Sequence, residues 1–130
     1  MKKILTLSIA LILVAGIVSL AKSADIDSDQ VTTRCPKDRH IVKTSNGTVV
    51  VLYYRGTDPY GIRAKKSTDN GASWTKLDGT SGSTEIEWDA EYDFSVCLDG
   101  SDNIYVSYRP KYGIYFKKLT YSAGSWTVPG

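Results

Sequence analysis

The sequence predicts an all-β chain that consists of two repeated four-stranded antiparallel units behind a short leader. Three observations predict this fold class. Short stretches rich in β-branched and aromatic residues alternate with Asn-Gly and Asp-Gly turns. No window beyond the N-terminus has a helical period. Several segments of the first half of the chain recur in the second half at a nearly constant distance.

The recurring segments set the length of the repeat. The Tyr-Arg pair at 54–55 returns at 108–109, and the Ser-Trp-Thr triplet at 73–75 returns at 125–127. The offset in numbering is 54 for the pair (108 − 54) and 52 for the triplet (125 − 73), and the loop at 56–59 accounts for the difference. Further matches at an offset of 52 are Tyr60-Gly61-Ile62 with Tyr112-Gly113-Ile114, and Lys65-Lys66 with Lys117-Lys118. A four-stranded repeat of roughly 50 residues is typical of a β-propeller blade.

Each strand of the first unit is bounded by a recognisable signal. The first ends before the Asn46-Gly47 turn, the second is a run of valine, leucine and tyrosine, and the fourth begins at Trp74. The strands expected in this unit are 40–44, 49–54, 61–67 and 74–77. The second unit repeats the pattern at 94–98, 104–109, 114–119 and 125–128. We therefore expect a first blade at 34–78, followed at 79–130 by a link and a second blade.

Residues 67–74 form a motif, Ser-x-Asp-x-Gly-x-x-Trp, in which each fixed position has a physical role. The carboxylate of Asp69 can accept backbone N–H bonds from the residues that follow it, which closes an Asx-type turn. Gly71 supplies a positive φ without steric cost. Ser67 can hydrogen-bond across the hairpin, and the ring of Trp74 can cover the turn. The second copy keeps only the last fixed residue, as Trp126. Its first three fixed positions are occupied by Leu119, Tyr121 and Ala123.

This motif is the Asp box, or BNR repeat, and through it the chain resembles the sialidase superfamily from about Thr33 to Thr127. The resemblance implies a six-bladed propeller, of which these residues supply two blades, and it implies the hydrolysis of terminal sialic acids on extracellular glycans. A non-catalytic propeller that binds glycans or proteins is the alternative, because a fold by itself does not fix a function.

The resemblance also implies site residues. Arg34-Cys35-Pro36 occupies the position at which the family often has Arg-Ile-Pro, and the arginine of that motif binds the substrate carboxylate. Arg39 is a second candidate for that role. Asp58 matches the position of the acid/base carboxylate, and Asp93 resembles a further substrate contact. The alternatives without a function are that Arg34 and Arg39 are solvated loop arginines and that Asp58 belongs to an ordinary Asp-Pro turn. The stretch around Trp88 is interpreted as packing between blades, with stacking on a sugar ring as the alternative.

The family mechanism uses a tyrosine nucleophile paired with a glutamate, together with two more arginines, and all of these come from later blades. We therefore expect the chain to be catalytically incomplete by itself. Propellers usually have four to eight blades, and about three repeats are needed for stability. The remaining blades come either from a longer chain or from further copies of this one, since three two-bladed chains would make six.

The N-terminus has the features of a bacterial secretory signal peptide. Met1-Lys2-Lys3 precedes an apolar run at 4–20, and small residues favour cleavage after Ala21 or Ser23. An uncleaved anchor is the alternative, because the apolar run at 4–20 only just reaches the length of a membrane span. The sequence thus predicts a signal peptide at 1–21, a flexible arm at 22–33, and a secreted or periplasmic protein without membrane attachment after cleavage.

Charge and cysteine content exclude other classes. Cleavage removes two of the 16 basic residues and leaves 14 basic against 14 acidic residues, so no basic footprint for nucleic acid remains. Cys35 and Cys97 either form a disulfide after export or stay separate buried thiols. With His40 as the one histidine and no Cys-x-x-Cys pair, no metal site and no cofactor are expected.

Overall fold

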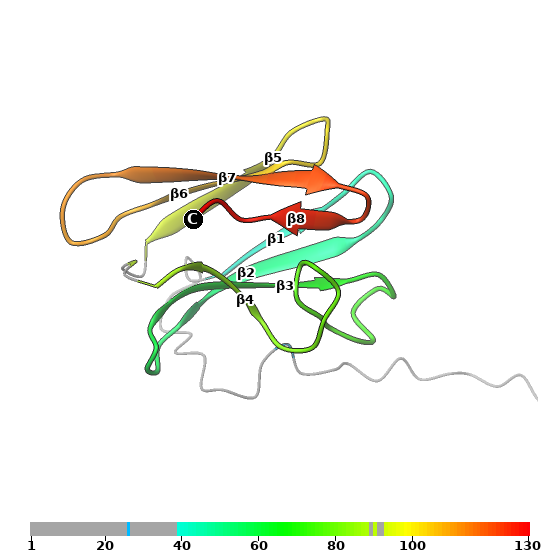
Figure 1. Ribbon diagram of the computed structural model, residues 1–130, viewed down its shortest axis with the longest axis horizontal. Helices are drawn as coiled ribbons and strands as arrows, with labels where there is room; N and C mark the ends of the chain where they lie inside the picture. The colour runs from blue at the N-terminus through cyan, green and yellow to red at the C-terminus, as the bar shows by residue number, and fades with distance from the viewer. Residues whose placement is uncertain (1–25, 27–38, 89, 91–92) are drawn as a thin grey trace, which may run out of the picture.

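Eight strands form two four-stranded antiparallel sheets in the computed structural model, which describes residues 26, 39–88, 90 and 93–130 (Figure 1). The first sheet, in the order of its strands, contains β1 (Arg39–Lys43), β2 (Val49–Arg55), β3 (Gly61–Ser67) and β4 (Thr84–Glu87). The second contains β5 (Phe94–Leu98), β6 (Ile104–Tyr108), β7 (Tyr115–Ser122) and β8 (Ser125–Thr127). No helix occurs among the described residues, so the predicted all-β fold with two four-stranded units is confirmed.

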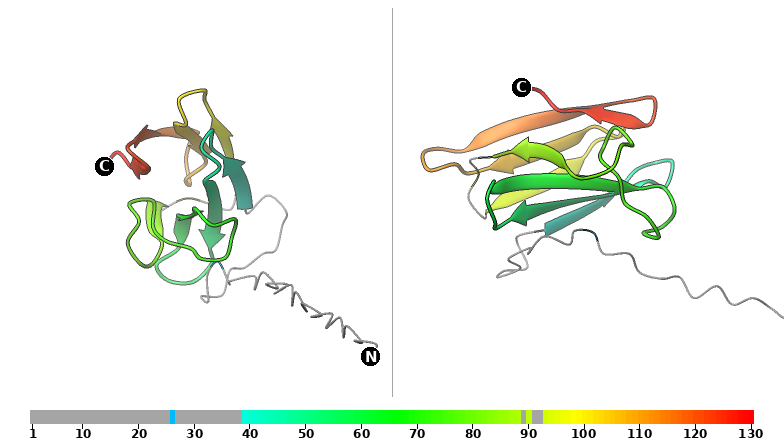
Figure 2. Two further views of the ribbon diagram at one scale, coloured as in Figure 1. Left: turned by 90° about the vertical axis from the view of Figure 1, so that its right-hand side faces the viewer. Right: turned by 60° about the horizontal axis from the view of Figure 1, so that its bottom comes forward.

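The two sheets lie one on the other, with β1 beside β5 (Figures 1 and 2). The ring nitrogen Nε2 of His40 donates to the carbonyl oxygen of Phe94 at 2.8 Å, so the starts of these two strands meet. Beyond their other ends, the backbone N–H and the hydroxyl of Ser45 donate to the carboxylate of Asp102 at 2.9 and 2.6 Å. The strands β1 and β5 therefore run side by side in the same direction.

The loops β1–β2 and β5–β6 have the same hydrogen bonds, which shows how the two sheets correspond. Thr44 N–H donates to the carbonyl of Thr48, and Asp99 N–H donates to the carbonyl of Asn103, so this part repeats at an offset of 55 (99 − 44). The pairs Val51 with Lys65 and Val106 with Lys117 then place the third strands at an offset of 52 (117 − 65). By this count Tyr108 corresponds to Tyr53. The repeated Tyr-Arg pair in the sequence instead matches Tyr108 with Tyr54.

This correspondence means that the sheets stack front to back. On β2, Leu52 and Tyr54 face the second sheet and join the shared core, whereas Val51 faces the other way. On β6 the core residues are Ile104, Val106 and Tyr108, and Val106 corresponds to Val51. The second sheet covers one face of the first sheet. The corresponding face of the second sheet is turned away from the core between them. The core between the sheets consists of the buried residues Val50, Leu52, Tyr54, Ile62, Ala64, Leu77, Ile86, Ala90, Phe94, Ile104, Val106, Tyr108, Leu119 and Trp126.

The fourth strand of the first sheet is not where the sequence predicts it. Residues 74–77 form only one bridge, between Thr75 and Lys66, and the strand β4 begins at Thr84. Leu77 leaves the sheet edge because its side chain is fully buried in the core, and its N–H bonds to the hydroxyl of Thr84 at 2.8 Å. Ile86, on β4, is also buried there, so both segments supply a core side chain, although only β4 forms a strand beside β3.

Candidate functional site

The loops of the two sheets gather at opposite ends of the molecule (Figure 1). One end, which we call the β2–β3 end, carries the loop between β2 and β3, the loop between β6 and β7, and the starts of β1 and β5. Asp58, Arg39 and Asp93 all fall at this end, while the Asp box lies at the other. Arg34 and Cys35 lie outside the described residues.

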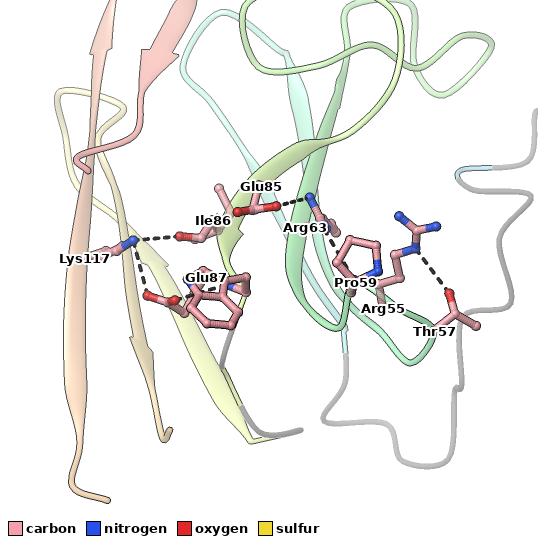
Figure 3. A network of polar contacts seen from close by, with 9 residues as sticks. Arg55, Thr57, Pro59, Arg63, Glu85, Ile86, Glu87 and Lys117 are labelled. Atoms are coloured by element: carbon pink, nitrogen blue, oxygen red, sulfur yellow. Dashed lines mark hydrogen bonds and ion pairs between the residues drawn. The ribbon is translucent and has the colours of Figure 1, made fainter. Parts of the chain in front are cut away.

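Side-chain contacts hold the β2–β3 loop against the first sheet (Figure 3). The guanidinium of Arg63 donates to the carbonyl of Pro59 at 3.4 Å and forms an ion pair with Glu85 at 2.7 Å. Arg55 Nε donates to the hydroxyl of Thr57 at 3.2 Å. Asp58, joined to Pro59 by a cis peptide bond, stays exposed at the tip of this loop. Its carboxylate is therefore accessible to a ligand, as a site residue requires.

The strand register places three arginine positions on one face of the first sheet near this loop. Position 39 pairs with Tyr53, which pairs with Arg63, and Arg55 lies two residues beyond Tyr53 on the same face. Arg63 is 6% exposed, and its Nε makes no hydrogen bond among the described atoms. Guanidinium groups such as those of Arg55 and Arg63 on this face suit the binding of an anion. Sequence reasoning missed Arg63; the signal was a charged residue inside a strand where the second copy has Tyr115.

A cleft of about 380 Å³ opens at the same end between β1 and the second sheet. Asp93 lies exposed on its wall, and the ring of His40 meets the ring of Phe94 edge to face at 4.8 Å. The remaining lining residues are Ser95, Ser107, Tyr108, Arg109 and Ile114. Asp58 and Asp93 thus share an end of the molecule but belong to different features of it, the loop tip and this cleft.

A third feature of the β2–β3 end is a set of contacts around Glu87. The hydroxyl of Tyr108 donates to its carboxylate at 2.8 Å, and the ammonium of Lys117 lies 3.3 Å from the same oxygen. Lys117 also donates to the carbonyl of Ile86 at 2.9 Å, which joins the second sheet to the edge strand of the first (Figure 3). Burial, followed by the bond to Glu87, raises the pKa of Tyr108 to about 12, so this phenol remains a donor.

At the opposite end, residues 67–74 form the turn that their types predict. The hydroxyl of Ser67 donates to Asp69 at 2.7 Å and accepts the N–H of Gly71 at 2.8 Å. Asp69 accepts the N–H and the hydroxyl of Ser73 at 2.9 and 2.5 Å. These bonds, those from Ser73 first, lower the pKa of Asp69 to about 2. Because the side chains of Ser67 and Asp69 form their hydrogen bonds within the turn, the Asp box here acts as a structural element.

The described residues show further properties that bear on function. Cys97 is exposed on β5 and forms no disulfide with another described residue, so it is not the buried thiol of the alternative. Its pairing with Cys35 stays a prediction, because Cys35 lies outside the described residues. No group of three or more histidine, cysteine, aspartate or glutamate side chains in the described ranges is arranged to hold a metal ion. Within the same ranges, no helix has the length and apolar character needed to cross a membrane.

Comparisons with family models, with curated proteins and with solved structures gave no significant match. The resemblance to the sialidase superfamily therefore depends on the residues of the motif and of the repeat alone. What it implies for activity, partners and location is carried forward as a proposal.

Proposed function

We propose that the described sheets are two consecutive blades of an Asp-box β-propeller of sialidase type, and that the protein binds extracellular glycans at its β2–β3 end. The front-to-back stacking supports the first part, because blades that repeat around an axis must pack in this way. The predicted export signal supports an extracellular or periplasmic location.

The observation that carries the glycan site is the distribution of functional groups between the two ends. Asp58, Asp93 and the arginine positions 39, 55 and 63 lie at the β2–β3 end, whereas the Asp box lies at the other end. Aromatic side chains are exposed at the same end, among them Tyr60 at 54%, Trp88 at 66% and Tyr112 at 76%. Carboxylates, guanidinium groups and exposed aromatic rings together suit the hydroxyls, carboxylate and apolar faces of an acidic glycan.

Hydrolysis of terminal sialic acids is the activity that we propose for this end once the remaining blades are present. Asp58 is the proposed acid/base, and Arg34 or Arg39 the proposed partner of the sialic-acid carboxylate. The exposure of Asp58 on the β2–β3 loop favours this assignment. The tyrosine–glutamate pair and the other two arginines have to come from blades outside these two.

Turnover of a fluorogenic sialoside by the protein with all its blades tests this proposal. Asp58→Ala removes the acid/base group, so we expect kcat to fall about 10²- to 10⁴-fold. Asp78→Asn, at an exposed aspartate of the β3–β4 loop, is the matched control and should leave kcat unchanged. A normal rate for Asp58→Ala would remove Asp58 from the mechanism.

The non-catalytic alternative predicts binding without hydrolysis. A glycan array probed with the wild-type chain and with Asp58→Ala would then give equal signals, and no released sialic acid would be detected. The exposed aromatic residues favour this alternative as strongly as they favour the enzyme, because stacking requires no catalytic carboxylate.

The open face of the second sheet supports the proposal that another sheet packs there. Its exposed residues include Phe116 at 62% and Ile114 at 83%, and these two correspond in the repeat to Ala64 and Ile62, which are fully buried beneath the second sheet. A further blade of a longer chain, or the first sheet of another copy, would bury them in turn. Light scattering of the purified chain separates these cases: a closed oligomer favours further copies, and a monomer favours a longer chain.

A further inference from the structure

We propose that the groove beside Trp88 binds the apolar face of a neutral hexopyranose. This inference rests on the proposed function, since it names one sugar class and one position for the glycan at the β2–β3 end. The groove, called here the Trp88 groove, has a volume of about 250 Å³ and is lined by Glu87, Trp88, Tyr108, Pro110 and Tyr115.

Trp88 is available to a ligand instead of packing between the two sheets. Its side chain is 66% exposed, although it directly follows β4, whose Ile86 is buried in the core. The interpretation of Trp88 as packing between these sheets is therefore wrong. A large amphipathic ring left in solvent beside a groove is typical of a binding position, because it offers much apolar area with little loss of conformational entropy.

The backbone that carries Trp88 is held in place by close packing. A Cβ atom on Gly61 would lie 2.6 Å from the Cα of Trp88 and 2.2 Å from the carbonyl oxygen of Glu87, so only glycine allows this approach. On the other wall, the rings of Tyr108 and Tyr115 stack at a centroid distance of 6.1 Å and an angle of 28°. Glu87, Tyr108 and Tyr115 lie on strands, so these lining residues are positioned before the ligand binds, which reduces the cost of ordering on binding.

The charges in the groove favour a neutral ligand. Glu87 supplies the one carboxylate of the lining, and Lys117, 3.3 Å away, neutralises it while the hydroxyl of Tyr108 donates to it. Because this carboxylate is already paired, neither a cation nor an anion gains an unpaired charge in the lining. A neutral sugar needs no such charge, because its C–H face stacks on an aromatic ring and its hydroxyls replace water around the ion pair.

The size of the groove fits one sugar ring. Pockets for drug-sized ligands measure roughly 300–1,000 Å³, and this groove is smaller. A second hollow of about 540 Å³ shares Glu87 and Trp88 and continues past Lys117 to Val128 and Pro129. A chain of sugars can therefore extend from the Trp88 groove along the outer edge of the molecule.

Binding of methyl β-galactopyranoside, lactose and sialyllactose to the full chain tests the inference, measured by ligand-observed NMR so that loss of tryptophan does not remove the probe. We expect Trp88→Ala to weaken binding of the two neutral sugars about tenfold, the loss that one stacking contact causes. Trp88→Phe should retain part of the affinity. The control Ile41→Ala, at an apolar residue that is 67% exposed and lies outside this groove, should bind like the wild type.

The outcomes separate this inference from the proposed function. Sialyllactose binding that Asp58→Ala abolishes and Trp88→Ala leaves intact would overturn the Trp88 groove and keep the glycan site. Absence of binding to every sugar would overturn both. Binding of a proline-rich peptide, lost in Trp88→Ala, with no binding of the neutral sugars would also overturn the inference, because it would assign the aromatic groove to a peptide.

Discussion

The Asp-box turn of the first sheet and the β7–β8 turn of the second occupy the same place in the repeat but reverse the chain by different means. The first uses side-chain hydrogen bonds of Ser67 and Asp69. The second is a two-residue hairpin with both φ positive, 47° at Ala123 and 83° at Gly124, and the carbonyl of Gly124 accepts a bond from Lys66 at 2.6 Å. Loss of the motif therefore does not require loss of the turn.

The change of turn also moves the outer strand along its partner. Thr75 pairs with Lys66 in the first sheet, and its counterpart Thr127 pairs with Thr120 in the second. A strict repeat would pair Thr127 with position 118 (66 + 52), so the observed partner lies two positions further along β7. A shift of two positions keeps every side chain on its original face. Trp126 can therefore still face the core, although the residues around it have changed.

The largest difference between the two turns should appear at their tryptophans. Trp126 is 5% exposed, and its indole N–H donates to the carbonyl of Asp102 at 2.8 Å. The indole nitrogen of Trp74 is buried but makes no hydrogen bond among the described atoms. We expect Trp126→Ala to lower the free energy of unfolding by about 3–5 kcal/mol, and Trp74→Ala by less than half as much. Urea unfolding followed by circular dichroism measures both, and equal losses would contradict the comparison.

The next largest effect should come from the serine that closes the Asp box. Ser67 is 2% exposed and accepts the N–H of Gly71, so Ser67→Ala leaves that donor without its partner. We expect a loss of about 1–3 kcal/mol in the free energy of unfolding. The exposed Ser122 next to the β7–β8 turn is the matched control, and Ser122→Ala should cost a few tenths of a kcal/mol, roughly the range of surface substitutions. Similar values for the two variants would show that the side-chain bonds do not stabilise the turn.

The second turn should be improved by a residue that tolerates positive φ. Ala123→Asn creates the Asn-Gly sequence preferred in two-residue hairpins. We expect the free energy of unfolding to rise by about 0.4–1 kcal/mol, because alanine is strained at a φ of 47°. The same measurement on Ala72→Asn, within the Asp box, serves as the comparison and should show no gain. A destabilised Ala123→Asn variant would contradict the assignment of the turn.

The smallest effect should be a difference in acid sensitivity. The pKa of Asp69 is lowered from 3.8 to about 2, so the bonds it accepts stabilise the fold above its ordinary pKa and are lost as the pH falls through about 2. Thermal unfolding of the wild type should therefore shift to lower temperature between about pH 4 and 2. Asp69→Asn should reduce that dependence in part, because the pKa of Asp99, lowered mainly by the side chain of Asn103, also falls to about 2. An unchanged pH profile in Asp69→Asn would show that its carboxylate is not coupled to folding.

Local sequence was sufficient where the determining contacts lie within one hairpin. The predicted strands 61–67 and 94–98 coincide with β3 and β5, and the turn at residues 67–74 forms the hydrogen bonds that its serine and aspartate imply. These features depend on residues a few positions apart. The candidate site is less local. The sequence placed Asp58 and Asp93 near strand ends, whereas Arg63 was missed because its importance depends on Tyr53 and Glu85 beside it.

The sequence by itself determined the all-β class, the repeat and its turns, because β-branched periodicity and turn residues act over short distances. Only the tertiary structure decided that Thr84–Glu87, and not residues 74–77, completes the first sheet, since Leu77 and Ile86 are both buried in a core that the other sheet helps to form. It also decided that Trp88 stands in solvent. Both results depend on contacts between the two sheets, which no pattern within either repeat encodes.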